Sequence, residues 1–241
     1  MGSPAIQFEN GEFYHIIKRG IERRAIFLDD EDKLRFINSL LVFNDNQPSP
    51  WESRAFWNQR EPFLLGRNYC PKEPLAEIHN FVLMSNHFHL LLRQVADGGI
   101  VKLLKKLGGY VYYFNKKNKR QGTLFQGTYK AREIENETQL KNTFVYIATN
   151  PVEIVEPRWK LWEVKNASQA ISFLENRYRW SSYWDYLGKT NFPKVIVRDF
   201  FLNLYGGAEA LRKEINTWVQ FRNEILAAGG REEFEKKTKL E

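Results

Sequence analysis

The sequence predicts an α+β fold, in which the strands of an antiparallel sheet alternate with helices. Short segments rich in aromatic and β-branched residues are typical of strands, and they alternate with segments whose apolar residues recur at helical spacing. The segments 75–84 and 87–94 are separated only by Ser85-Asn86. So short a connection joins antiparallel neighbours, because parallel strands require a long crossover.

The first part of the chain has the predicted order β-α-β-β-α-β-α. The acids Asp29-Asp30-Glu31-Asp32 mark a helix start, where the helix dipole favours negative charge. Asn136 and Gln139 resemble an N-cap and its partner three residues on. The predicted elements are a strand at 12–18, a helix from 29–32 onward, strands at 75–84 and 87–94, a helix with an apolar stripe from 100 to 114, a hairpin or bent strand within 122–134, and a helix from 136 to just before Pro151.

Two regions lie outside this alternation. Residues 44–72 contain several prolines and scattered aromatic residues, which favour a long surface insertion. The chain beyond Pro157 is helical in pattern, with segments at 167–177, 197–205 and 208–228. We therefore predict a first domain at 1–157, with the insertion, and a helical C-terminal extension at 158–241.

Composition narrows the class of protein. The 241 residues are 43% hydrophobic and 15% aromatic, which is ample for a packed core, and the net charge of +7 favours an anionic partner. One cysteine excludes an intramolecular disulfide and a cysteine-based metal site. Residues 1–13 show no signal-peptide pattern, and no segment approaches the length of about 20 apolar residues that spans a membrane. We expect a cytoplasmic protein with no membrane association.

His87-Phe88-His89 places two imidazoles on one face of a predicted strand, because residues two apart point to the same side. Neutral imidazoles on a rigid strand suit a divalent metal. The alternative is one polar residue at a strand end and one buried, hydrogen-bonded histidine. For the lone histidines His15 and His79 we favour a structural role in the core, with His15 as the alternative candidate for lining a site.

The helix that contains Tyr146 carries a second candidate group. At about 100° per residue, Leu140, Phe144, Ile147 and Ala148 share the core face, while Tyr146 and Asn150 lie on the opposite side. Residues four apart are neighbours on a helix, so a phenol and an amide oxygen can approach one site together. The alternative is a surface tyrosine and a helix-ending asparagine.

A basic segment lies between these two motifs. Residues 101–132 contain nine Lys or Arg and no Asp or Glu, with tyrosines and phenylalanines interleaved. Cations neutralise phosphates and aromatic rings stack on bases, so the segment suits single-stranded nucleic acid. The candidate DNA-binding residues are Lys102, Lys105, Lys106, Lys116, Lys117, Lys119, Arg120, Lys130 and Arg132, extended by Lys18, Arg19, Arg23 and Arg24.

In this order, the motifs resemble those of the one-tyrosine transposases of the HUH nuclease superfamily, in particular the REP-associated tyrosine transposases. The resemblance covers roughly residues 12–187, interrupted by the insertion. The matching segments are 14–20 (YHIIKRG), 84–92 (MSNHFHLLL), 122–127 with 129–131, 146–152 (YIATNPV) and 180–183 (WSSY). Members of that group often have proline where this chain has Ser85.

The resemblance implies a ferredoxin-like (RRM-like) antiparallel sheet with helices on one face. It also implies that His87, His89 and Asn150 bind Mg²⁺ or Mn²⁺ and that Tyr146 is the nucleophile. The activity implied is single-strand DNA cleavage near hairpins through a 5′-phosphotyrosine intermediate, followed by strand transfer. The implied partner is single-stranded or hairpin DNA, and the protein would act as a monomer or homodimer.

Two other functions remain open from the sequence. The same fold and basic segment suit a non-catalytic nucleic-acid-binding regulator, and the metal site suits a phosphodiesterase that activates water in place of Tyr146. No phosphate-binding or dinucleotide-binding glycine motif is present, so we expect no nucleotide cofactor.

Overall fold

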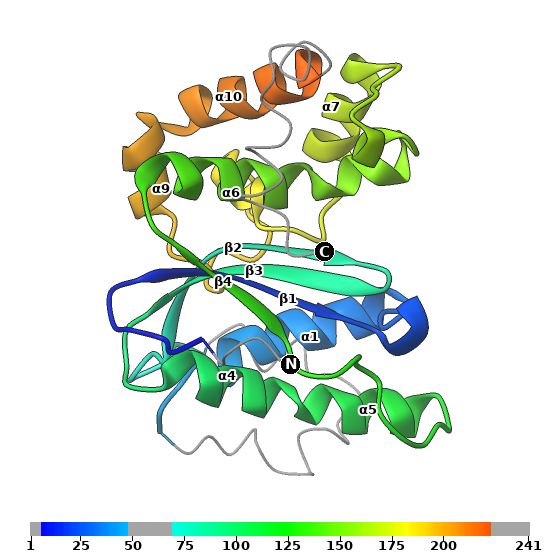
Figure 1. Ribbon diagram of the computed structural model, residues 1–241, viewed down its shortest axis with the longest axis vertical. Helices are drawn as coiled ribbons and strands as arrows, with labels where there is room; N and C mark the ends of the chain where they lie inside the picture. Colours follow the sequence, from blue (N-terminus) through cyan, green and yellow to red (C-terminus); the bar gives the residue numbers. More distant parts are fainter. Residues whose placement is uncertain (1–5, 48–68, 223–241) are drawn as a thin grey trace.

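The computed structural model describes residues 6–47 and 69–222, and its centre is a four-stranded antiparallel sheet (Figure 1). The strand order is β2-β3-β1-β4. The strands are β1 (Phe13–Arg19), β2 (Ala76–Met84), β3 (His87–Gln94) and β4 (Lys130–Ile134). This order, with helices in the two crossovers, is that of a ferredoxin-like sheet, so the predicted fold class is confirmed.

One face of the sheet is covered by the helices of the two crossovers. These are α1 (Asp30–Val42), α4 (Gly99–Leu107) and α5 (Gly109–Lys117). The Phe36 ring of α1 lies 4.6 Å from that of Phe88 on β3, between ring centroids. The single helix expected over 100–114 is divided at Gly108, where a Cβ atom would lie 2.9 Å from the Lys105 carbonyl oxygen.

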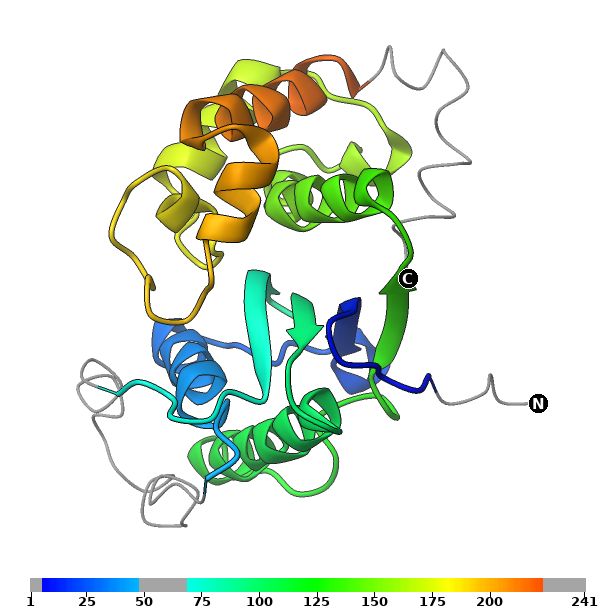
Figure 2. The ribbon, with the colours of Figure 1, turned by 90° about the vertical axis from the view of Figure 1, so that its left-hand side faces the viewer.

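Helix α6 (Glu137–Thr149) crosses the opposite face of the sheet and is itself covered by the C-terminal extension (Figure 2). Asn136 is its N-cap, as predicted, and accepts a hydrogen bond from the backbone N–H of Gln139 at 2.9 Å. Helix η3 (Asn150–Ile154) follows α6. The described part of the extension comprises η4 (Trp159–Leu161), α7 (Ala167–Asn176), α8 (Tyr183–Tyr186), α9 (Asp199–Tyr205) and α10 (Ala208–Gln220).

The extension also covers an edge of the sheet. The backbone N–H of Leu83 donates to the Trp180 carbonyl at 2.9 Å, and that of Ser182 donates to Phe81 at 3.1 Å. An exposed strand edge invites pairing with another chain, and these bonds protect β2 from it. The described extension therefore shares one hydrophobic core with the sheet, and the division at 157/158 stays a prediction.

Two predicted segments are described only in part. Most of the predicted insertion lies outside the described residues, but its ends are held together, because the Asn44 side chain both accepts from and donates to the backbone of Ala76. The bent strand expected within 122–134 is limited to β4, with an isolated bridge between Gly20 and Phe125. Among the described helices, none has the length and hydropathy needed to cross a membrane.

Candidate active site between the sheet and helix α6

His87 and His89 lie on the face of β3 that α6 covers. Their ring centroids are 5.0 Å apart, and they are 2% and 0% exposed. Phe88, between them in sequence, points to the other face and packs on α1. The predicted pairing of the two imidazoles on one strand face is therefore confirmed. On the neighbouring strand β1, Ile17 is opposite His89 and Arg19 is opposite His87.

The His87 ring is oriented by Asn86, the residue before it in the β2–β3 turn. The Asn86 amide nitrogen donates to the Arg23 carbonyl at 3.1 Å, so its Oδ1 is the atom that faces His87. That oxygen can only accept, and it lies 2.6 Å from Nδ1 of His87. His87 must therefore donate from Nδ1. In the neutral ring this leaves the lone pair on Nε2, which is the state that binds a metal.

His89 is held by His15, on β1. Nε2 of His15 lies 2.8 Å from Nδ1 of His89, and the two rings are stacked with centroids 5.1 Å apart. Burial, followed by the neighbouring charges of His87, His15, Lys160 and Arg19, lowers the pKa of His89 well below its usual value. His89 is therefore neutral, as a metal ligand must be.

The structural role in the core that we favoured for His15 describes only part of its position. The side chain is buried, but it also contacts the candidate active site. Its ring lies 5.1 Å from that of His89 and 5.8 Å from that of Tyr146. The only signal in the sequence is that His15 shares a strand face with Ile17, and the sequence does not reveal that Ile17 pairs with His89. By contrast, His79 has the expected core role, bonded to the Val197 carbonyl and the Glu77 carboxylate.

Tyr146 projects from α6 toward the sheet, with its ring centroid 5.5 Å from that of His89. The predicted division of α6 into a core face and an outward face is wrong, because both faces are buried. Phe144 stacks on Phe201 of the extension at 4.6 Å, while Thr143 and Tyr146 are 1% and 6% exposed. The covering extension changes the environment of the helix, and the side that carries Tyr146 meets the histidines.

Asn150 follows α6 without a break in helical geometry, since its φ and ψ are −52° and −38°. It is 3% exposed and lies one turn beyond Tyr146. Within the described chain, Oδ1 of Asn150 and Nε2 of His89 are buried and have no hydrogen-bond partner. A buried polar atom without a partner is costly. Both atom types are ligands for Mg²⁺ and Mn²⁺, so the residues present fit such an ion.

An ion bound here would depend on the amide oxygen of Asn150. Across residues 6–47 and 69–222, no three His, Cys, Asp or Glu side chains are grouped so that they could hold a metal. The three histidines His15, His87 and His89 therefore do not form such a group, and Nε2 of His15 is engaged with His89.

The predicted basic residues divide between the two faces of the sheet. Arg19, Lys130 and Arg132 lie on the same face as the histidines, since Lys130 pairs with Ile17 and Arg132 pairs with His15. The cations of α4, α5 and the loop that follows lie on the other face, at Lys102, Lys105, Lys106, Lys116, Lys117, Lys119 and Arg120.

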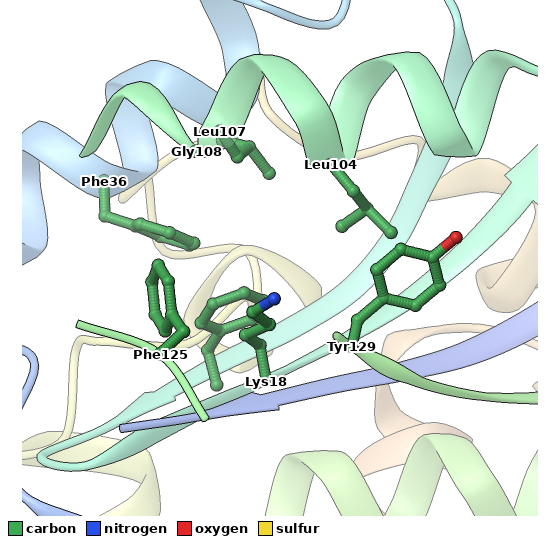
Figure 3. A pocket seen from close by; sticks show the side chains of 8 residues that line it. Lys18, Phe36, Leu104, Leu107, Gly108, Phe125 and Tyr129 are labelled. Atoms are coloured by element: carbon green, nitrogen blue, oxygen red, sulfur yellow. The ribbon is translucent and has the colours of Figure 1, made fainter. Parts of the chain in front are cut away.

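Several of these basic residues have partners within the protein, and three of them bear on the prediction. Lys117 lies within 3.1 Å of the carboxylates of Asp29, Glu31 and Asp32, and Arg24 pairs with Glu22 at 3.2 Å. Lys18 borders a cavity of about 50 Å³ beneath α4, next to Phe125, and donates to the Gly127 carbonyl (Figure 3). Burial lowers the pKa of Lys18. The acids of the first helix thus bind Lys117 in addition to marking the helix start.

Comparisons with known proteins do not assign this chain to a family. No protein-family model matches the sequence, and no curated protein matches it. Among solved structures, a REP-associated tyrosine transposase bound to a REP hairpin is similar at 15% identity and a TM-score of 0.44, over 83% of this chain and 93% of that chain. Similarity at this level carries no argument about the site.

Proposed function

We propose that this protein is a metal-dependent endonuclease and strand transferase of single-stranded DNA, acting near hairpins with Tyr146 as the nucleophile. The observation that carries the proposal is the placement of Tyr146 against His89, with ring centroids 5.5 Å apart, in a site that also holds His87. A phenol beside two neutral imidazoles combines a nucleophile with ligands for an ion that activates a phosphodiester.

His87, His89 and Asn150 are the residues that would hold the ion. The hydrogen bond from Nδ1 of His87 to Asn86 and the hydrogen bond between Nδ1 of His89 and His15 fix both rings. A bound Mg²⁺ or Mn²⁺ would polarise the scissile phosphate and stabilise its developing negative charge. Arg19, opposite His87 on the same face of the sheet, would add positive charge for the DNA backbone.

The reaction of Tyr146 is a displacement at phosphorus. Its phenol oxygen forms a bond to phosphorus and loses its proton to solvent, while the bond from phosphorus to the 3′ oxygen breaks and that oxygen takes up a proton. The products are a 5′-phosphotyrosine and a free 3′-OH. Attack by another 3′-OH on the phosphotyrosine reverses these changes and joins two strands, so no ATP is required.

The proposal is tested by trapping this covalent product. The protein is incubated with a DNA hairpin carrying a single-stranded flank and Mn²⁺, and a denaturing gel separates any protein–DNA adduct. We expect an adduct with the parent protein and none with Tyr146→Phe. Tyr112→Phe is the matched control, because Tyr112 is 43% exposed on α5, on the other face of the sheet. Equal adduct from parent and Tyr146→Phe would exclude Tyr146 as the nucleophile.

A second candidate function is a DNA-binding regulator without catalysis. The observation in its favour is the burial of the site, since His87, His89, Tyr146 and Asn150 are all between 0% and 6% exposed. Hairpin binding without cleavage in Mg²⁺ and in Mn²⁺ would support this function. Cleavage without an adduct would instead support a phosphodiesterase that activates water.

A further inference from the structure

A polar cavity of about 490 Å³ lies beside the candidate active site, where the pairing of β1 with β4 ends. We call it the strand-edge pocket. Its β1 residues Ile17 and Arg19 are the residues paired with His89 and His87 on β3. Side chains of directly paired residues point to the same face, so the pocket opens on the face that carries the two histidines.

The lining of the pocket has the chemistry of a nucleotide site. Among the described residues that line it are three cations and no carboxylate, together with two uncharged polar side chains and one tyrosine. These residues are Arg19, Arg23, Lys130, Gln126, Thr128 and Tyr129. Cations and polar side chains bind the phosphate and sugar of a nucleotide. The ring of Tyr129 turns to the other face of the sheet, beneath α4 (Figure 3). The volume falls within the range of about 300–1,000 Å³ that is common for ligand pockets.

The rim of the pocket is held in an unusual backbone conformation. Glu22 and Arg23 both have positive φ, 53° and 59°, in a region that residues other than glycine seldom adopt. Gly20 precedes them at a close approach, because a Cβ atom there would lie 2.2 Å from the Arg24 carbonyl oxygen. The backbone N–H of Gln126 donates to the Arg19 carbonyl at 2.8 Å and fixes the opposite side. Strained segments of this kind are concentrated at functional sites.

The same turn is connected to Nδ1 of His87, on the side of the ring opposite the Nε2 atom that would bind a metal. The Arg23 side chain lines the pocket, and its carbonyl accepts the hydrogen bond from Asn86. Asn86 in turn accepts the hydrogen bond from Nδ1 of His87. A ligand that binds the Arg23 side chain therefore acts on a turn that is two hydrogen bonds away from the His87 ring.

We infer that the strand-edge pocket binds one nucleotide of the DNA strand, with its phosphate, next to the cleaved phosphodiester, and that its occupancy is transmitted to His87 through Arg23 and Asn86. This inference rests on the proposed function for the identity of the strand. It adds a defined subsite to the general basic surface, and it assigns Asn86 as a positioning residue that acts through His87.

The test measures binding without cleavage. A fluorescent six-residue thymidine strand is titrated with protein in EDTA at several salt concentrations. We expect Arg19→Gln and Lys130→Gln to weaken binding, each lowering the slope of log affinity against log salt by about 0.7, the value for one phosphate contact of a single strand. Lys213→Gln is the matched control, because it removes one exposed charge from α10 of the C-terminal extension, outside the predicted DNA-binding residues, and it should leave the slope unchanged.

Three outcomes would overturn the inferred nucleotide site. They are an unchanged slope in both pocket variants, an equal loss in Lys213→Gln, and no change in the imidazole NMR signals of His87 at saturating strand. His79 is the internal reference for the spectra, since its ring bonds Val197 and Glu77. The binding assay needs neither metal nor Tyr146. Strand binding without any covalent adduct would therefore reject the proposed activity and still support nucleotide binding in the strand-edge pocket.

Discussion

Nε2 of His15 lies 2.8 Å from Nδ1 of His89, and neither side chain is exposed. A single hydrogen occupies the space between the two nitrogen atoms, so one ring donates and the other accepts. When His89 donates, its Nε2 keeps the lone pair that a metal requires. Residues that orient a metal-ligating histidine in this way commonly have a large effect on metal affinity.

The first prediction concerns His15 itself. We expect His15→Ala to weaken Mn²⁺ binding by about 10- to 100-fold, because His89 loses the partner that fixes its ring. Isothermal titration calorimetry measures the affinity. His79→Ala removes an equally buried histidine of the same sheet and should leave the affinity unchanged. An equal loss in both variants would show that the effect is one of general stability.

The second prediction concerns Asn150, whose Oδ1 is buried without a hydrogen-bond partner among the described residues. Asn150→Asp places a carboxylate there, and a buried charge without a partner is unfavourable. We expect the variant to lose about 2 kcal/mol of unfolding free energy in EDTA and to recover it in Mn²⁺, since the ion would bind the new charge. Urea unfolding with and without Mn²⁺ tests this. A loss that Mn²⁺ does not reverse would place Asn150 outside the metal site.

The third prediction concerns Lys117. Its ammonium group forms an ion pair with the fully buried Asp32, at 2.8 Å, and with Asp29 and Glu31. We expect Lys117→Gln to lower the unfolding free energy by about 3 kcal/mol, since it removes the cation from a buried carboxylate that keeps, within the described chain, only the hydrogen bonds from Tyr113 and Leu28. Lys105→Gln, at an exposed position, should change it by less than about 0.5 kcal/mol. Thermal unfolding at low salt measures both. Weaker DNA binding by a Lys117→Gln protein of unchanged stability would instead assign Lys117 to the DNA surface.

The fourth prediction concerns the pH dependence of the C-terminal extension. The hydrogen bonds from Arg212 lower the pKa of Glu175, at 2.8 Å to each carboxylate oxygen. The lowered pKa means that the ion pair stabilises the folded protein fully above about pH 4.5, the usual pKa of a glutamate. This stabilisation is lost as the pH falls through the pKa that Glu175 has in the folded protein.

We therefore expect Glu175→Gln to lower the unfolding free energy by about 1 kcal/mol at pH 7, a modest value because Arg212 is partly exposed. The difference from the parent should shrink below pH 4.5, which thermal unfolding across pH 3–7 would reveal. Glu209→Gln is the control, since Glu209 faces the same arginine but is 90% exposed. A difference that persists at pH 3 would exclude the ion pair as its cause.

Local patterns predicted most of the elements of this fold. Their apolar, aromatic and β-branched residues, with the short connection at Ser85-Asn86, predicted strands β2 and β3 within one residue of their observed bounds, and Asn136 marked the start of α6. The division at Gly108 and the short β4 were not predicted. The division at Gly108 coincides with a close approach of its backbone to the Lys105 carbonyl oxygen. The length of β4 depends on its pairing with β1.

The sequence by itself determined that His87 and His89 share a strand face and that Tyr146 and Asn150 lie one helical turn apart. These are properties of a single strand and a single helix, fixed by periods of 2 and 3.6 residues. Only the tertiary structure decided that Tyr146 faces His89, that His15 joins them, and that the extension buries the other side of α6. Those contacts depend on strand register and on layer packing between distant segments, which no local period encodes.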